Sequence, residues 1–174
     1  RYSTTYADGT TPLPSTFISV SESAVYVVPW NTYLGALTAD ATTANDVTAN
    51  GTLPGSALSA NVIPSSANGR AVGLNTPPAM AADGTIVTGA PYDGIVTINS
   101  AAAFQFTRPL SAGMLDAQRL TEHEIDEVIG LGSAIDRFDD LRPQDLFSWS
   151  APGVRNVTTS GSRYFSIDGG NTNI

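Results

Sequence analysis

The residues with the clearest capacity for chemistry are His123, Glu124 and Glu127, in the run His123-Glu124-Ile125-Asp126-Glu127. On a helix, side chains four residues apart project from the same face, so the His123 imidazole and the Glu127 carboxylate can reach one ion. Zinc accepts nitrogen and oxygen ligands, and Glu124 stands where it can take a proton from metal-activated water. The spacing therefore predicts a metal site of the H-E-x-x-H kind, with a carboxylate replacing the second imidazole.

A second interpretation of this run is a solvent-exposed helix face. The segment from Glu122 to Glu127 places four carboxylates in six residues, and such runs are most often solvated. A lone histidine is likewise more often a surface or capping residue than a ligand. The apolar neighbours favour a largely buried helix instead, and buried carboxylates need a cation to balance them. These neighbours are Leu120, Ile125, Val128, Ile129 and Leu131.

The pattern around the motif predicts one long helix. Leu115 to Leu131 contains no proline, and Ser111 or Asp116 can cap its start. Gly130 and Gly132 supply the left-handed conformation in which helices commonly end. The three candidate side chains are therefore expected on a regular helical surface.

Tyr92 to Phe106 is the clearest strand pattern, and it begins at the turn Asp93-Gly94. Side chains alternate between the two faces of a strand. One face is expected to carry Ile95, Thr97 and Asn99, and the other Val96 and Ile98.

Weaker patterns account for the rest of the chain. Residues 1–15 are rich in Thr and Pro without a period and predict a flexible N-terminal arm. Thr16 to Val28 predicts a long strand or a hairpin, and Thr32 to Ala49 an amphipathic helix. Short strands and loops are expected over residues 52–91, and a strand around Arg163 to Ile167.

Composition narrows the class of protein. The chain has 174 residues, 41% of them hydrophobic, with no apolar run long enough for a membrane span. Its net charge is −8, and all eight basic residues are arginines, so nucleic acid is not an expected partner. Cysteine is absent, which excludes disulfides and thiolate ligands. The abundance of Ser, Thr, Ala, Gly and Asn is typical of secreted bacterial proteins.

Four segments together resemble a group of secreted bacterial zincin-like metalloproteases, and the likeness covers the chain from the Leu34 region onward. The resemblance implies an α+β fold with a twisted mixed sheet, a backing helix at Thr32 to Ala49 and the active-site helix beneath the sheet. It further implies one domain over residues 16–174, with the Tyr92 to Phe106 strand near a cleft that holds an extended peptide. The segments are YDGIVTINSAAAFQFTRP, LTEHEIDEVIGLGS, RPQDLFSWSAPGVR and RYFSIDGGNTN.

The function that follows from this resemblance is a secreted zinc endopeptidase acting on peptide or protein substrates. His123, Glu127 and Asp145 would bind Zn²⁺, and Glu124 would act as general base in hydrolysis by metal-activated water. Relatives of this type continue beyond FSIDGGNTN, so we expect this chain to be a trimmed form.

The third ligand is the least determined part of the site. Metzincins have a third histidine where this chain has Ser133, and His123 is the only histidine. Asp145 is the preferred candidate because it lies 18 residues after Glu127, close to the spacing of glutamate-type zincins. Asp136 and Asp139 are alternatives.

Several alternatives to these assignments stay open. Asp145 could instead cap a helix or pair with Arg142, and a set of His, Glu and Asp would also suit calcium or manganese. Calcium in addition to zinc is a further option, since Asp168 to Asn171 has the look of a calcium loop, although a tight turn is favoured. Tyr164 could donate to an oxyanion, although packing is the favoured role.

Two other classes of function compete with the peptidase. One is a non-catalytic extracellular structural or self-assembling protein that retains the fold, for which a homo-oligomer is an open option. The other is a carbohydrate-binding β-domain. That class predicts aromatic residues gathered in one cleft, whereas Trp30 and Trp149 lie in segments expected to form the core.

Overall fold

The computed structural model describes residues 1–135 and 139–173. The chain divides into two compact units, which we describe separately. The first unit comprises residues 1–24, 65–67 and 77–129, and the second comprises residues 25–64, 68–76 and 130–174.

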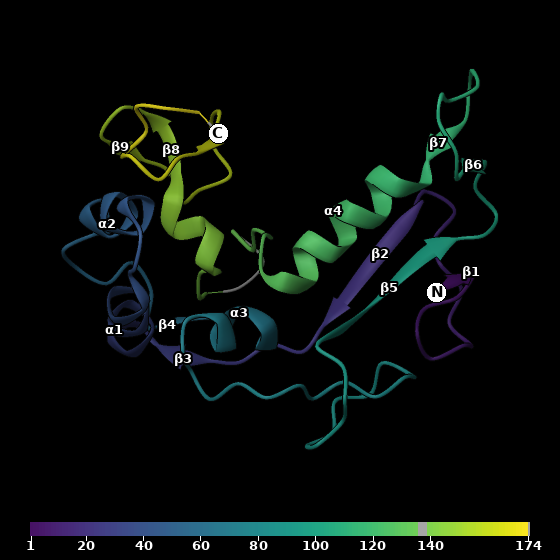
Figure 1. Cartoon of the computed structure of the whole chain (residues 1–174), viewed down its shortest axis with the longest axis horizontal. Coiled ribbons are helices and arrows are strands. Elements are labelled where there is room, and N and C mark those ends of the chain that lie inside the picture. Colours follow the sequence, from purple (N-terminus) through teal and green to yellow (C-terminus); the bar gives the residue numbers. More distant parts are fainter. Residues whose placement is uncertain (136–138, 174) are drawn as a thin grey trace. The chain divides into compact units, whose positions relative to one another are not determined.

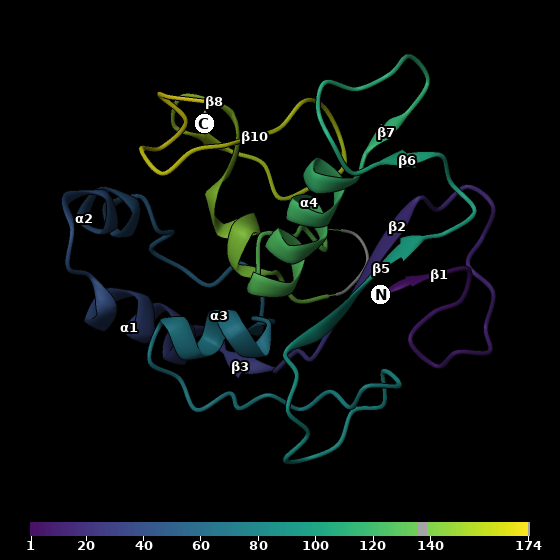
Figure 2. The same cartoon turned by 45° about the vertical axis from the view of Figure 1, so that its right-hand side comes forward.

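A three-stranded mixed sheet forms the centre of the first unit. Strand β5 (Gly94–Asn99) lies between β1 (Tyr2–Ser3), with which it is parallel, and β2 (Ser19–Ser23), with which it is antiparallel (Figure 2). The segment expected to be a loose arm over residues 1–15 therefore contributes an edge strand. The Ile98 N–H donates to the Arg1 carbonyl at 2.9 Å, so backbone hydrogen bonds hold this segment to the sheet.

The two faces of β5 pack into different apolar clusters, as the alternation predicted. Ile95 packs in one cluster with Ala7, Ala24, Ala79 and Met80. Ile98 on the opposite face packs with Phe104 and Ala117, and Val96 lies against that cluster. The face bearing Ile98 is the one that helix α4 (Ala117–Ile129) covers.

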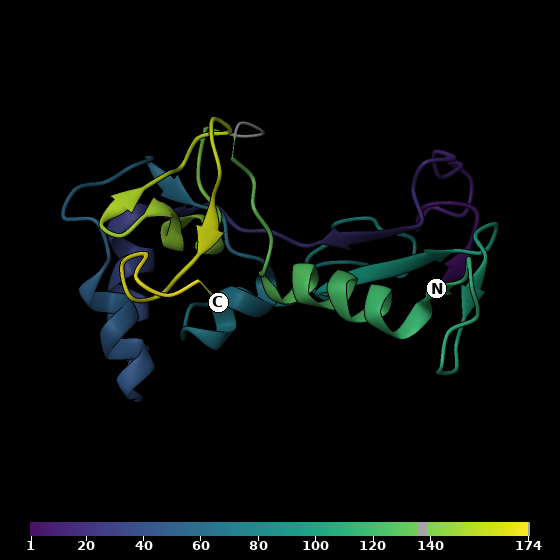
Figure 3. The ribbon, with the colours of Figure 1, turned by 90° about the horizontal axis from the view of Figure 1, so that it is seen from above.

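Helix α4 confirms the helix predicted over Leu115 to Leu131, with each end two residues inside the expected bound. It follows two short paired strands, β6 (Phe104–Gln105) and β7 (Leu115–Asp116). The Asp116 carboxylate accepts the Arg119 N–H at 3.2 Å, and Gly130, with φ of +112°, ends the helix. The helix runs along β2 and β5, as Figures 1 and 3 show.

In the second unit, the single helix predicted over Thr32 to Ala49 is two helices, α1 (Trp30–Asp40) and α2 (Ala44–Gly51). The break has a local cause. Thr43 accepts the Asp46 N–H through its side chain, and the Asp46 carboxylate accepts the Thr43 N–H at 2.7 Å. This capping box starts a new helix where the pattern alone suggested continuity.

The remaining elements are short. The predicted strand around Arg163 to Ile167 is confirmed as β10 (Tyr164–Phe165), which pairs with β8 (Ser148–Ala151), and β8 in turn pairs with β9 (Val154–Arg155). The long strand or hairpin predicted over Thr16 to Val28 is instead two strands in separate units, β2 and β3 (Val28–Pro29), which do not pair with each other. Strand β4 (Asn61–Val62) pairs with β3, and the two other short helices are α3 (Ser66–Ala71) and the 3₁₀ helix η1 (Pro143–Phe147).

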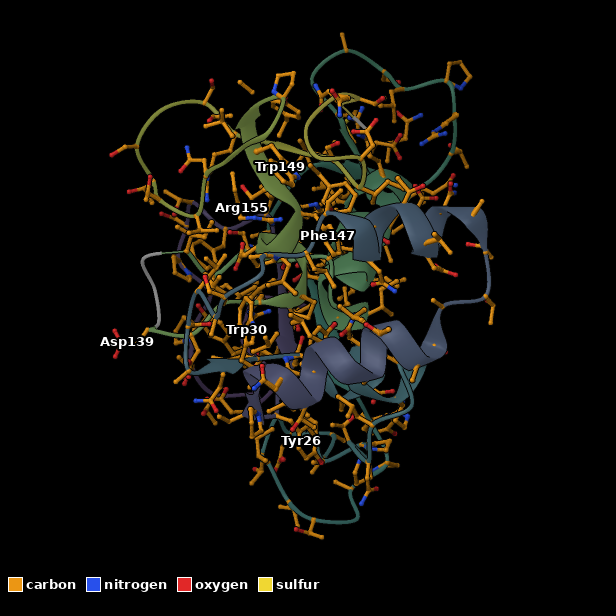
Figure 4. The ribbon with its side chains drawn as sticks, turned by 90° about the vertical axis from the view of Figure 1, so that its left-hand side faces the viewer. Tyr26, Trp30, Asp139, Phe147, Trp149 and Arg155 are labelled. Carbon is orange, nitrogen blue, oxygen red and sulfur yellow. The ribbon has the colours of Figure 1, made fainter. Side chains whose placement is uncertain are left out.

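Both tryptophans are buried in the second unit, as expected. Trp30 packs with Tyr33, Val62 and Leu146 in its core, and the Trp149 indole donates to the Ser166 carbonyl at 2.9 Å. Arg155 lies over the Trp149 ring, 4.2 Å from its centroid, and Figure 4 shows the two side chains together.

The architecture is thus a mixed α+β fold with several small sheets. The zincin-like arrangement and the single domain over residues 16–174 stay predictions. Within residues 1–135 and 139–173, none of the helices combines the length and apolar character needed to cross a membrane.

Candidate metal centre

Helix α4 places the two predicted ligands side by side. The Nε2 atom of His123 lies 3.7 Å from Oε1 of Glu127, and the two side chains are 65% and 37% exposed. Two ligands each about 2.0 Å from a tetrahedral zinc ion would be about 3.3 Å apart. A small adjustment of either side chain therefore lets both atoms contact one ion. We call His123 and Glu127 the ligand pair.

The prediction that the motif helix is largely buried is wrong. Ile125 and Ile129 are each 47% exposed, and the only buried residues of α4 are Ala117 and Glu124. The reason is geometric, because a helix lying on a sheet buries one face and leaves the opposite face uncovered. Ile125 and Ile129 lie four residues apart on such an uncovered face.

The acidic run divides into two kinds of carboxylate. Glu122 and Asp126 are exposed, and Glu122 accepts a hydrogen bond from Gln118 one turn earlier. The solvated interpretation therefore holds for these two acids. Glu124 and Glu127 both bond to strand β2 instead.

Glu124 lies beneath the helix, only 5% exposed. Its Oε1 accepts a hydrogen bond from the Ser19 hydroxyl at 2.5 Å. A buried carboxylate needs such a donor, and here a serine on β2 supplies it. Glu124 is thus held through Oε1, and its role as general base stays a prediction.

Glu127 is held in the same way. Its Oε2 accepts a hydrogen bond from the Ser21 hydroxyl, while Oε1 is the atom nearest His123. The two carboxylate oxygens therefore face different partners. The outer flank of α4 that carries the ligand pair lies on the β2 side of the sheet.

The serines of β2 are site residues that the sequence prediction missed. Ser19, Ser21 and Ser23 alternate with Val20 and Glu22 and so share one face of the strand. The residues of β5 opposite these three serines are not polar; they are Ile98, Val96 and Gly94. The alternation in the sequence SVSES could have indicated this polar face, but Glu124, the partner of Ser19, lies 105 residues further along the chain.

Gly94 lets α4 approach the sheet closely. A Cβ atom at this position would lie 2.9 Å from both Val128 methyl carbons and 2.5 Å from the Glu22 carbonyl oxygen. These separations are shorter than van der Waals contact, so only glycine fits without movement of its neighbours. The close approach brings the acids of α4 within reach of the short serine side chains.

Asp145 belongs to the second unit and serves as a helix cap. Its carboxylate is 1% exposed, and Oδ2 accepts the Arg142 N–H at 2.9 Å and the Ala134 N–H at 3.2 Å. The bond from the Arg142 N–H caps η1, which corresponds to the capping alternative for this residue, and the bond from the Ala134 N–H ties a preceding segment to it. A role as third ligand stays a prediction. Asp145 also borders a pocket of about 370 Å³ with Ser133, Gln144, Ser148, Gly161, Arg163, Tyr164 and Phe165.

Two further candidates, Asp139 as a ligand and Tyr164 as a donor, belong to the second unit. Asp136 lies outside the described residues, and Asp139 lies in a bend of the second unit. The Tyr164 hydroxyl donates to the Gly170 carbonyl at 2.5 Å, so its proton is engaged within the second unit. Among the residues that the structure describes, no three His, Asp or Glu side chains are grouped closely enough to hold an ion.

Asp168 to Asn171 forms the tight turn favoured over a calcium loop. The Asp168 carboxylate accepts the Ser166 hydroxyl at 2.6 Å and the N–H groups of Asn171 and Thr172, each at 2.9 Å. The Ser166 bond is the main reason that the pKa of Asp168 is lowered to about 2. Gly169 and Gly170 both have positive φ, as this turn requires.

Comparisons with known proteins give no relative for this chain. No protein-family model, no curated protein and no solved structure matches it.

Proposed function

We propose that this chain is a metal-dependent peptidase in which the ligand pair binds zinc and Glu124 is the general base. The observation that carries the proposal is the 3.7 Å separation of His123 Nε2 and Glu127 Oε1 on one helix face. A bound zinc ion supplies a Lewis acid that polarises a peptide carbonyl and makes water a nucleophile at neutral pH. The zincin-like fold and the secreted location are parts of the same proposal, and they rest on the sequence resemblance and the composition.

The substrate in this proposal is an extended peptide held along β2. The strand Tyr92 to Phe106 was expected to border the cleft, and within it β5 pairs with β2 along its length and with β1 at Ile98 and Asn99. Strand β2 is an edge of the three-stranded sheet. The Asn99 N–H donates to the Ile18 carbonyl and the Ala24 N–H to the Asp93 carbonyl.

This pairing sets the direction of every backbone group on β2. In an antiparallel pair, alternate residues point their N–H and C=O groups to the partner strand. Ile18 and Ala24 point to β5, so Ser19, Ser21 and Ser23 point their backbone groups to the outer edge. A peptide could add there as a further strand beside the ligand pair.

The test is the substitution Glu124→Gln, which keeps the size of the side chain and an acceptor for Ser19 but removes the base. We expect zinc content, measured by mass spectrometry of the metal, to equal that of the wild type, and casein hydrolysis to be lost. Glu122→Gln is the matched control, because Glu122 is an exposed acid on the same helix, and it should retain activity. Unchanged hydrolysis in the Glu124 variant would remove the catalytic claim.

A second candidate function is a non-catalytic extracellular structural protein that binds zinc. The burial of Glu124 against Ser19 favours it, because a carboxylate fixed beneath its helix also has a purely structural use. Stoichiometric zinc without hydrolysis of casein by the wild-type chain would favour this candidate over the peptidase.

A further inference from the structure

We propose that the pocket of about 370 Å³ beside Asp145 binds a neutral sugar of the size of one hexose unit. The described residues that line this pocket all belong to the second unit, whereas the ligand pair belongs to the first. The inference therefore goes beyond the proposed function, and the sugar site uses no metal ion.

The pocket has the size and the frame of a small-molecule site. Ligand pockets commonly have volumes of about 300–1,000 Å³, and this one lies at the lower end of that range. Phe165 of β10 and Ser148 of β8 both line it, and the two residues are partners in the antiparallel ladder. Gln144 and Asp145 line it from η1. Hydrogen-bonded elements thus hold the lining in place before a ligand arrives, which lowers the entropy lost on binding.

The charges of the lining favour a neutral ligand. Among the described residues that line the pocket, the two charged ones are Arg163 and Asp145, and they have opposite signs. Asp145 is 1% exposed and already accepts two backbone N–H groups. An anion that paired with Arg163 would lie near this carboxylate, and a cation would lie near the guanidinium. A ligand without charge avoids both repulsions.

The polar groups that stay available in the pocket include donors and acceptors. Arg163 is exposed, and its guanidinium makes no hydrogen bond or ion pair to the residues that the structure describes. Within the same residues, the Ser148 hydroxyl and the Gln144 amide make no hydrogen bond, and Oε1 of Gln144 is buried. The amide can therefore turn toward the pocket without breaking a bond. A guanidinium only donates, whereas an amide and a hydroxyl both donate and accept. The several hydroxyls of a sugar ring, each a donor and an acceptor, satisfy this mixed set.

Two aromatic residues also border the pocket, and both side chains are fixed. The Tyr164 hydroxyl donates to the Gly170 carbonyl at 2.5 Å. Phe165 makes an edge-to-face contact with Phe147, with ring centroids 6.0 Å apart. The C–H groups on the face of a sugar ring pack against aromatic side chains. The carbohydrate-binding class predicted aromatic residues gathered in one cleft, and Tyr164 and Phe165 take the place expected for the tryptophans.

Saturation-transfer NMR on the whole chain tests this inference. The probes are D-glucose, D-galactose, D-mannose and N-acetyl-D-glucosamine, with acetate and phosphate as charged competitors. We expect at least one of the sugars to bind and neither anion to displace it. Addition of EDTA should leave sugar binding unchanged, because the pocket residues need no metal.

Substitutions in the lining locate the site. Arg163→Ala should raise the dissociation constant of the bound sugar by about 10-fold or more, because it removes charged donors. Gln144→Leu keeps a similar size without the amide and should raise it by about 5-fold. Arg119→Ala is the matched control, because Arg119 is an exposed arginine of the first unit, and it should bind the sugar as the wild type does.

Three results would overturn the inference. They are the absence of binding by all four sugars, unchanged binding in both the Arg163 and the Gln144 variants, and displacement of the sugar by acetate or phosphate. Loss of zinc binding or of casein hydrolysis bears only on the proposed function, because those assays report on the first unit.

Discussion

At the scale of single residues, the face that a carboxylate occupies on α4 decides its use. Glu122 and Asp126 contact solvent, whereas Glu124 and Glu127 accept hydroxyl hydrogen bonds from β2. The i, i+4 spacing predicted that His123 and Glu127 would meet, because that is a local property of any helix. Which acids would be buried was not predictable, because it depends on the surface against which the helix packs.

Asp145 shows the same limit in another form. Its spacing from the motif suggested a ligand, but its carboxylate accepts two backbone N–H groups inside the second unit. Aspartate at a helix start and aspartate at a metal look alike in a sequence. Only the partners of the oxygens distinguish the two roles.

The capping role gives a prediction for Asp145. Asp145→Ala should lower the free energy of unfolding by about 1–3 kcal/mol, because two backbone donors lose a buried acceptor. Asp145→Asn keeps an acceptor oxygen and should cost less. Urea unfolding measures both, and equal stability of the alanine variant and the wild type would contradict the role. The zinc affinity of the asparagine variant tests the third-ligand prediction separately.

At the scale of elements, the helix predicted over Leu115 to Leu131 corresponds to α4. The single strand predicted over Tyr92 to Phe106 is instead two strands, β5 and the short β6, which pairs with β7 in a separate sheet. The helix over Thr32 to Ala49 was broken by the cap at Thr43. Helix α3 was missed, because its sequence SANGRA contains a glycine that opposes helix formation.

The packing of α4 on the sheet depends on Gly94. Gly94→Ala should destabilise the protein by about 1–3 kcal/mol, because the added methyl group overlaps Val128 and the Glu22 carbonyl. Val128→Ala in the same chain should recover part of this loss, since it removes one of the two clashes.

Gly35→Ala is the control for that prediction, because Gly35 lies within α1 and nothing stands within 4 Å of its Cβ position. This substitution should be neutral or stabilising by up to about 1 kcal/mol. Thermal unfolding compares the variants. Equal effects at Gly94 and Gly35 would contradict the close approach of α4 to the sheet.

The cap of α4 predicts a pH dependence. The Arg119 N–H, followed by the Arg108 guanidinium, lowers the pKa of Asp116 below its ordinary 3.8. A lowered folded-state pKa means that this contribution is present above about pH 4 and is lost as the pH falls through the lower value. Asp116→Asn should therefore flatten the fall in melting temperature between neutral and acid pH. A variant with the same acid slope as the wild type would contradict the contribution of this cap.

At the scale of the whole molecule, the candidate site belongs to one unit. The first unit contains the two serines of β2, Ser19 and Ser21, and the two acids of α4 to which they donate, Glu124 and Glu127. The sequence predicted the α+β class and the motif helix but not this pairing, because contacts over about a hundred residues leave no local pattern. The division into two units was likewise not predicted, since no linker composition marks it.

The central claim is that His123 and Glu127 share one cation, and an anomalous diffraction experiment on zinc-soaked crystals tests it most directly. At the zinc absorption edge, the account predicts one anomalous peak within bonding distance, about 2.0–2.2 Å, of both His123 Nε2 and Glu127 Oε1. The peak should bond one oxygen of Glu127, with Ser21 still donating to the other. If crystals soaked in excess zinc show no anomalous peak between these two atoms, or show a peak only at other residues, the account is contradicted.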